Sequence, residues 1–130
     1  MIENVGNVVL DLSKYSGTDL YSDGLVEDKM LSLAMSSGCV SEDEVSESWP
    51  VFYHFSPMRE NIVSWLPIGP SDDVLEIGSG CGAITGALSK MAHKVDTIDL
   101  SRKRSLINAY RHKEQSNIRI HVGNFLDMNL

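Results

Sequence analysis

The chain has 130 residues, of which 42% are hydrophobic and 22% charged, and a formal net charge of −7 at pH 7. This length can bury one modest core, which favours a single globular domain. No apolar run approaches the roughly 20 residues that cross a bilayer, and the two cysteines do not make a disulfide framework. We therefore expect a cytoplasmic protein with reduced thiols and no membrane partner.

The charge is unevenly distributed along the chain. Residues 1–48 hold ten acidic residues and two lysines, whereas residues 49–130 hold eight acidic and nine basic residues. We therefore predict an acidic N-terminal extension over 1–48 and a ligand-binding part over 49–130. Because a phosphate backbone attracts Lys and Arg, we expect no nucleic-acid partner. For the basic cluster we favour a solvent-facing helix surface over a polyanion site; its members are Arg102, Lys103, Arg104, Arg111 and Lys113.

The acidic part carries few signals of regular structure. An apolar run at 8–10 predicts a short strand, followed by a loop. Apolar positions over 25–36 predict one helix, and Gly38 is suited to its left-handed cap. Residues 41–48 are acidic and rich in serine, which predicts an exposed connection.

Helix signals become sharper at residue 56. Ser56 is a good N-cap, and Pro57 is suited to the first helical turn. Apolar residues at 58, 62 and 66 share one face of the predicted helix. Pro67 ends this helix, because proline cannot continue it.

The second half of the chain alternates between two periodicities. Apolar patterns predict strands at 73–77, 95–100 and 117–122, a helix that starts near Gly82 and runs to Met91, and a helix over 101–115. Strand, helix, strand, helix, strand at this spacing is a βαβαβ unit. Since such crossovers are right-handed, its sheet is parallel. We therefore predict an α/β, Rossmann-like fold.

A turn with three glycines follows the first of these strands. Gly78, Gly80 and Gly82 alternate with other residues just before the predicted helix. Glycine allows positive φ and a close approach of ligand to backbone, and a helix start offers amide N–H groups. The turn is therefore predicted to seat a nucleotide-sized ligand.

Polar or acidic residues mark the ends of the three strands, where ligands of open α/β sheets bind. Asp99 stands 21 residues beyond Gly78, a position suited to accepting hydrogen bonds from ribose hydroxyls. Asn124 is suited to pairing with an adenine edge, and Phe125 to contacting its ring face. The three strand ends together predict an adenosine-containing ligand.

Two kinds of adenosine ligand compete for this seat. The spacing Gly78-x-Gly80-x-x-Ala83 also satisfies the loose dinucleotide fingerprint, and Asp99 would serve NAD equally. Glu76 and the third glycine favour instead an adenosine ligand with a cationic amino-acid tail. An acid at this place suits such a tail and suits a pyrophosphate poorly.

These residues resemble a known family over residues 50–127. The segment from Val74 to Gly82 is similar to motif I of the class I S-adenosylmethionine (SAM) dependent methyltransferases, whose fold is Rossmann-like with three αβα layers. The resemblance implies that residues 49–130 are the SAM-binding, first βαβαβ half of such a domain, and that SAM or S-adenosylhomocysteine is bound. It implies the methionine portion at Glu76 and the glycine turn, ribose at Asp99, and adenine at Asn124 and Phe125. The complete predicted set is Glu76, Gly78, Ser79, Gly80, Cys81, Gly82, Asp99, Leu100, Asn124 and Phe125. Many members have Asp at the position of Asn124.

Two subgroups of that family are similar to parts of the chain. The segments 75–85 and 124–127 resemble the rRNA adenine dimethyltransferases. The segments 53–62 and 107–113 are more similar to methyltransferase domains attached to bacterial glycosyltransferases of surface-polysaccharide synthesis. We favour the second subgroup, which implies a glycosyltransferase or saccharide-pathway partner.

The family sheet has seven strands, and its acceptor-binding and catalytic residues lie largely after the fourth, so no catalytic residue is named. We expect a fragment of a longer enzyme, inactive alone, or a half-domain that uses a partner. Its first strand would then have an unpaired edge, which predicts a homodimer through that edge. An NAD-binding domain of an oxidoreductase and a non-catalytic nucleotide-binding or oligomerisation module remain the alternatives.

Overall fold

The structure is a computed structural model that describes residues 1–19, 24–37 and 49–130. Its elements in chain order are β1 (Ile2–Val5), β2 (Val8–Lys14), α1 (Leu25–Ser37), α3 (Trp49–Phe55), the 3-10 helix η1 (Pro57–Ile62), β3 (Asp73–Ile77), α4 (Thr85–Met91), β4 (Lys94–Asp99), α5 (Arg102–Arg111), β5 (Ile118–Gly123) and the 3-10 helix η2 (Phe125–Asp127). The predicted cap at Gly38 and the connection 41–48 lie outside the described residues. Within those residues, no helix combines the length and apolar character needed to cross a membrane.

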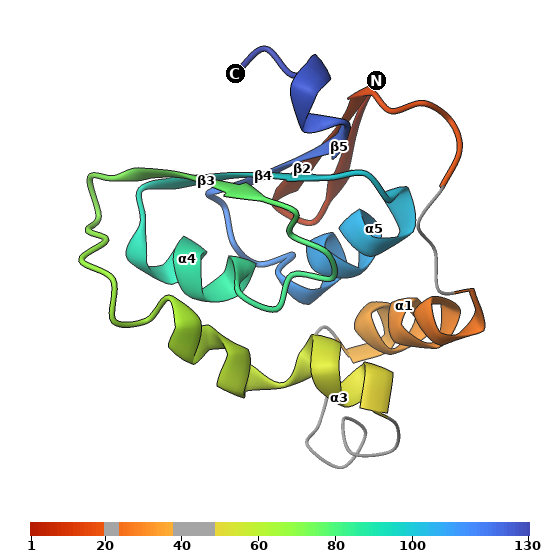
Figure 1. The fold of residues 1–130 in the computed structure, drawn as a ribbon, viewed down its shortest axis with the longest axis horizontal. Helices are drawn as coiled ribbons and strands as arrows, with labels where there is room; N and C mark the ends of the chain where they lie inside the picture. Colours follow the sequence, from red (N-terminus) through yellow and green to blue (C-terminus); the bar gives the residue numbers. More distant parts are fainter. Residues whose placement is uncertain (20–23, 38–48) are drawn as a thin grey trace.

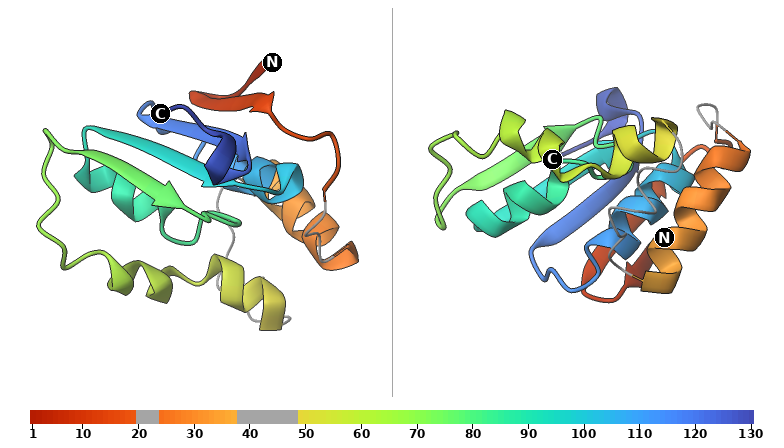
Figure 2. Two further views of the ribbon diagram at one scale, coloured as in Figure 1. Left: turned by 45° about the horizontal axis from the view of Figure 1, so that its top comes forward. Right: turned by 90° about the horizontal axis from the view of Figure 1, so that it is seen from below.

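The strands form one sheet in the order β1-β2-β5-β4-β3. Strands β2, β5, β4 and β3 are parallel, and β1 is antiparallel to β2. The predicted parallel βαβαβ unit is therefore confirmed. Because its three strands progress in one direction across the sheet, right-handed crossovers place α4 and α5 on the same face (Figure 1). Helices α1 and α3 lie beyond α4 and α5 on that side (Figure 2).

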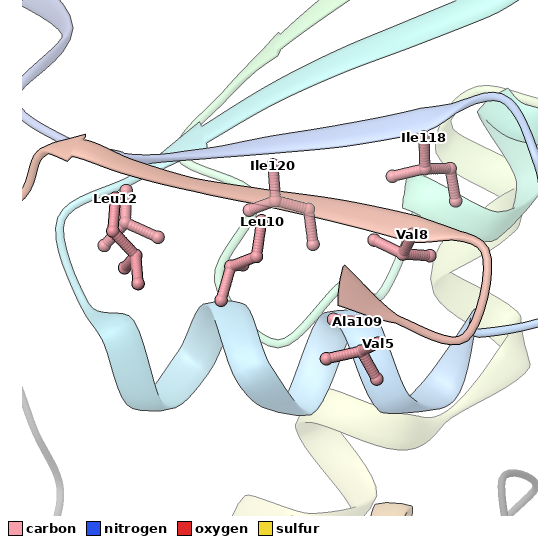
Figure 3. Packing of buried hydrophobic residues seen from close by; sticks show 8 residues of the cluster. Val5, Val8, Leu10, Leu12, Ala109, Ile118 and Ile120 are labelled. Carbon is pink, nitrogen blue, oxygen red and sulfur yellow. The ribbon is translucent and has the colours of Figure 1, made fainter. Parts of the chain in front are cut away.

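The N-terminal hairpin extends the sheet beyond β5. The strand predicted at 8–10 is present as β2, which continues to Lys14. Strand β1 was not predicted. The tip of the hairpin contacts the segment after α5, since the Asn7 N–H donates to the carbonyl of Lys113 at 2.8 Å. Alternate side chains of β2 join a core between the sheet and α5 (Figure 3), whose members are Val5, Val8, Leu10, Leu12, Ala109, Ile118, Ile120 and Val122.

The helix predicted after residue 56 is wrong in type and length. Ser56 does cap it, because its Oγ accepts the N–H of Met58 at 3.3 Å, but the element is a 3-10 helix that ends at Ile62. Met58 and Ile62 are 69% and 61% exposed. No buried stripe therefore supports an α-helix here. Instead α3, which was not predicted, buries Val51 and Phe55 against Met30 and Ala34 of α1 and against α5.

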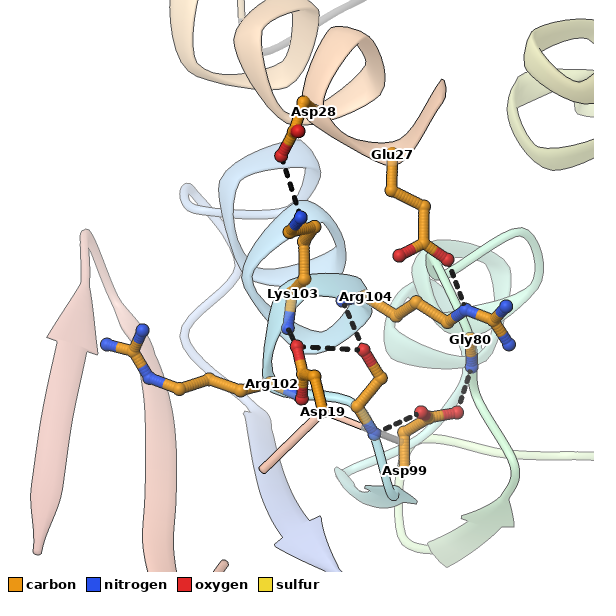
Figure 4. A network of polar contacts seen from close by, with 9 residues as sticks. Asp19, Glu27, Asp28, Gly80, Asp99, Arg102, Lys103 and Arg104 are labelled. Atoms are coloured by element: carbon orange, nitrogen blue, oxygen red, sulfur yellow. Dashed lines mark hydrogen bonds and ion pairs between the residues drawn. The ribbon is translucent and has the colours of Figure 1, made fainter. Parts of the chain in front are cut away.

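Acidic residues of the N-terminal part lie against the first turn of α5 (Figure 4). Three consecutive α5 residues each pair with one of them. Figure 4 shows Lys103 with Asp28 at 2.7 Å and Arg104 with Glu27 at 2.6 Å. Arg102 pairs with Glu3 at 3.2 Å. Asp19 accepts the N–H groups of Arg102 and Lys103 at 2.6 and 3.0 Å, as an acid at a helix N-terminus should. Acidic residues of the same chain thus pair with three of the five residues of the basic cluster. The first turn of α5, which carries these three, is not the solvent-facing surface that we predicted.

The opposite face of the sheet carries charged side chains that pair across strands. Arg119 of β5 donates to Asp11 of β2 at 2.6 Å, and His121 of β5 lies 2.8 Å from Asp96 of β4, which also pairs with Lys94. These residues line a hollow of about 520 Å³. They lie away from the carboxyl ends of the strands, where we predicted the ligand.

Acidification is expected to weaken the fold through Asp11 and Asp96. Burial favours their neutral forms, but hydrogen bonds from Arg119 and from His121 with Lys94 outweigh it and hold the pKa of each carboxyl below its ordinary value. Their contribution is present above the unfolded pKa of about 4 and is lost as the pH falls below it. Each pair should contribute about 1 kcal/mol. Urea unfolding at neutral and acidic pH should show a smaller loss of unfolding free energy in the Asp11→Asn, Asp96→Asn double variant than in the wild type. An equal loss would contradict this assignment.

Candidate functional site

A hollow of about 270 Å³ lies at the carboxyl ends of β3, β4 and β5. Five of the ten predicted site residues line it: Gly78, Asp99, Leu100, Asn124 and Phe125. The other lining residues are Ile77, Ile98, Arg104 and Gly123. The hollow therefore joins all three strand ends, as expected for an open α/β sheet. The remaining predicted residues belong to β3 and to the glycine turn beside it.

The three glycines of the turn have positive φ but different surroundings. A Cβ built on Gly78 or Gly80 would meet no atom within 4 Å, so the backbone at these positions is open to a ligand. A Cβ on Gly82 would lie 2.2 Å from Oδ1 of Asn108. The third glycine therefore allows the turn to pack against α5, and its role in ligand choice stays a prediction.

The turn is attached to the end of β4. The N–H groups of Gly78 and Ser79 both donate to the carbonyl of Ile98, at 2.8 and 3.2 Å. The carboxylate of Asp99 accepts the N–H of Gly80 at 2.8 Å and that of Ser101 at 2.9 Å. Helix α4 begins only at Thr85, later than predicted. The backbone N–H of Gly80 thus points at the carboxylate of Asp99.

Two predicted residues beside the turn are buried. Glu76 is 7% exposed, and its Oε2 accepts the hydroxyl of Thr85 at 2.7 Å. Burial raises the pKa of Glu76, and the hydrogen bond from Thr85 acts against this rise. Cys81 packs among α1, α3 and α5, and burial raises the pKa of its thiol to about 12. A thiol in that state is no nucleophile, so Cys81 can offer a ligand only its backbone.

The end of β5 supplies the third side of the hollow. Asn124 caps η2, with its Oδ1 accepting the N–H of Leu126 at 3.0 Å. Its oxygen is therefore engaged in the turn, and its amide NH2 group is the part suited to a ligand. Phe125 is 42% exposed at the rim, which suits contact with an aromatic ring.

Sequence reasoning missed Arg104 as a lining residue. Arg104 lies in the first turn of α5, and its Nε donates to Glu27 of α1, which is fully buried (Figure 4). No local pattern joins two residues that stand 77 positions apart. The N-terminal part thereby holds a positive side chain at the wall of the hollow, close to Asp99.

Comparison with known proteins finds similarity to methyltransferases. A family model described as ribosomal RNA adenine dimethylase matches residues 56–130, more than half of the chain. The ribosomal RNA small subunit methyltransferase A of Pediococcus pentosaceus is 40% identical over 42 residues, which are 32% of this chain and 14% of that protein.

Solved structures agree with the family match. A dimethyladenosine transferase from Plasmodium falciparum has 30% identity and a TM-score of 0.50 over 58% of this chain and 28% of its own. The phosphoethanolamine N-methyltransferase 1 of Haemonchus contortus has 19% identity and a TM-score of 0.55 over 85% of this chain and 24% of its own, a likeness of fold alone. The chain thus spans less than a third of each of these relatives. On the family match over residues 56–130, it belongs to the ribosomal RNA adenine dimethylase family.

Proposed function

We propose that this chain binds SAM at the carboxyl ends of β3, β4 and β5, as the cofactor-binding part of a SAM-dependent methyltransferase. The main support is the Asp99 carboxylate, which stands in the hollow between the glycine turn and Asn124 with Phe125. The Haemonchus contortus enzyme, which shares this fold, was solved in complex with S-adenosylhomocysteine.

The residues around the hollow fit the parts of SAM. Gly78 and Gly80 leave space where a side chain would stand, so the methionine portion can approach the backbone. Glu76 offers a carboxylate to the cationic methionine end, and Asp99 offers one to the ribose hydroxyls. Asn124, Leu100 and Phe125 contact the adenine, while Ser79, Cys81 and Gly82 complete the turn. When bound, SAM supplies an electrophilic methyl group on a sulfonium.

An NAD-binding domain is not favoured. The glycine spacing suits both cofactors, but a buried acid at Glu76 would repel a pyrophosphate, and the chain's family and solved relatives are methyltransferases. Calorimetric titration with SAM, S-adenosylhomocysteine and NAD tests the choice. The first two should bind and NAD should not. Binding of NAD alone would overturn the proposal. If none of the three ligands bound, a non-catalytic module would be favoured.

The methyl acceptor is a separate proposal. The family description names ribosomal RNA, whereas residues 53–62 and 107–113 favour a glycosyltransferase or saccharide-pathway partner. The pairing of Arg102, Lys103 and Arg104 with acids of the N-terminal part supports the second, because it removes a basic surface that a phosphate backbone would need.

The free edge of β3 is expected to support a homodimer. Strand β3 ends the described sheet, and Leu75 and Ile77 are 46% and 57% exposed. Apolar edges of this kind pair with other chains unless a charge blocks them. Light scattering should give a dimer for the wild type and a monomer for Leu75→Lys. Met58→Lys, at a residue 69% exposed on η1, should leave the dimer intact. A monomeric wild type at high concentration would contradict this assembly.

A further inference from the structure

A series of hydrogen bonds, part-buried at His112 and buried from Asn108 onward, runs from the end of α5 to Glu76. His112 Nδ1 lies 2.8 Å from Oδ1 of Asn108, Asn108 Nδ2 lies 3.0 Å from Oγ1 of Thr85, and that hydroxyl lies 2.7 Å from Oε2 of Glu76. Thr85 and Asn108 are fully buried, so water does not compete for their hydrogen bonds. The series therefore connects α5, α4 and β3 through side chains alone.

The protonation of His112 determines which group donates in every hydrogen bond of this series. His112 Nδ1 also lies 3.0 Å from the backbone carbonyl of Asn108, which can only accept, so Nδ1 carries the proton. Burial lowers the pKa of His112 to about 3, so the ring is neutral. Asn108 then accepts with Oδ1 and donates with Nδ2 to Thr85. The single hydroxyl proton of Thr85 is left to donate to Glu76.

Two glycines allow the close packing on which this series of hydrogen bonds depends. A Cβ on Gly82 would meet Asn108 Oδ1 at 2.2 Å, and a Cβ on Gly86 would meet His112 Nε2 at 2.6 Å. The absence of a side chain at Gly82 and Gly86 thus lets α4 and its preceding turn pack closely on Asn108 and His112 of the α5 segment. A fully engaged network of this kind is rigid, and its hydrogen bonds reinforce one another.

We propose, on the basis of the proposed function, that Thr85 and Asn108 are positioning residues that hold the Glu76 carboxylate in one orientation for the cationic methionine end of SAM. A donated hydrogen bond also opposes the effect of burial on the pKa of Glu76. The charged groups that face Glu76 are Asp99 of β4, which raises its pKa, and Arg59 of η1, which lowers it. Neither touches the Thr85 hydroxyl, whose contribution can therefore be removed separately.

The test compares two ligands by titration calorimetry on the whole chain. SAM carries the cationic methionine end, whereas 5′-methylthioadenosine keeps the adenosine and the sulfur without it. Thr85→Val has nearly the same shape and no hydroxyl. It should weaken SAM binding about tenfold and leave 5′-methylthioadenosine within about twofold of the wild type. The loss should grow as the pH falls, because Glu76 without the Thr85 hydroxyl becomes protonated more readily.

Two variants control for damage to the fold. Thr85→Ser keeps the hydroxyl and should restore SAM binding. Ser89→Ala removes another buried hydroxyl of α4, one that donates to Gln115 at 3.0 Å, and should leave both ligands unaffected. The inference is overturned if Thr85→Val binds SAM as the wild type does, or loses both ligands equally. A wild-type chain that binds 5′-methylthioadenosine or NAD but not SAM would instead overturn the proposed function.

Discussion

Replacing Asp99 with alanine is expected to reduce the affinity for SAM by about 100-fold or more, the largest effect on binding that we predict. Its carboxylate is the acceptor for the ribose hydroxyls in the proposed function, and hydrogen bonds to a charged group contribute about 1.5–3 kcal/mol each. It also accepts the N–H groups of Gly80 and Ser101, so the variant loosens the glycine turn as well. Titration calorimetry with SAM measures the combined loss.

The control for this variant lies on the same strand. Asp96→Asn removes a carboxylate that pairs with His121 and Lys94 on the opposite face of the sheet. It should lower stability by about 1 kcal/mol and leave the affinity for SAM unchanged. Asp99→Asn keeps one acceptor oxygen and should give an intermediate affinity. If Asp99→Ala bound SAM within about threefold of the wild type, the ribose contact and the placement of the cofactor would both be wrong.

Local patterns were sufficient to predict the half of the fold that holds the site. Strands β3, β4 and β5 each follow a short apolar pattern bounded by turn residues, and Asp99 stands directly at a strand end. The glycine turn was predictable because positive φ leaves few alternatives to glycine. Local sequence patterns here indicate both the strands and the candidate ligand-binding residues, since both depend on residues close together in the sequence.

The remaining features depend on contacts between distant parts of the chain. Strand β1 has four residues and buries only Val5, so it is held by pairing with β2 and carries no clear pattern of its own. The wall residue Arg104 is placed by Glu27, and the hydrogen-bond chain to Glu76 joins residues from three elements. Side-chain hydrogen bonds of this kind leave no periodicity in the sequence, and only the folded arrangement identifies them.

Gly82→Ala is expected to lower the free energy of unfolding by about 3 kcal/mol, from left-handed backbone strain together with overpacking. The backbone at Gly82 has a φ of +82°, and the new Cβ would lie 2.2 Å from Asn108 Oδ1. Asn108 cannot move aside, because it is fully buried and held by both Thr85 and His112. Urea unfolding should show a lower midpoint with an unchanged slope.

Gly80→Ala is the matched comparison, because it adds the same methyl group two residues earlier. Gly80 also has positive φ, at +55°, but no atom lies within 4 Å of its Cβ position. This variant should lose only about 1 kcal/mol of stability, the strain of its φ alone. It should nevertheless lose SAM affinity, since its methyl group enters the space proposed for the ligand. Equal losses of stability in the two variants would show that the turn does not pack on α5 as described. Unchanged SAM affinity in Gly80→Ala would show that the cofactor does not approach the turn there.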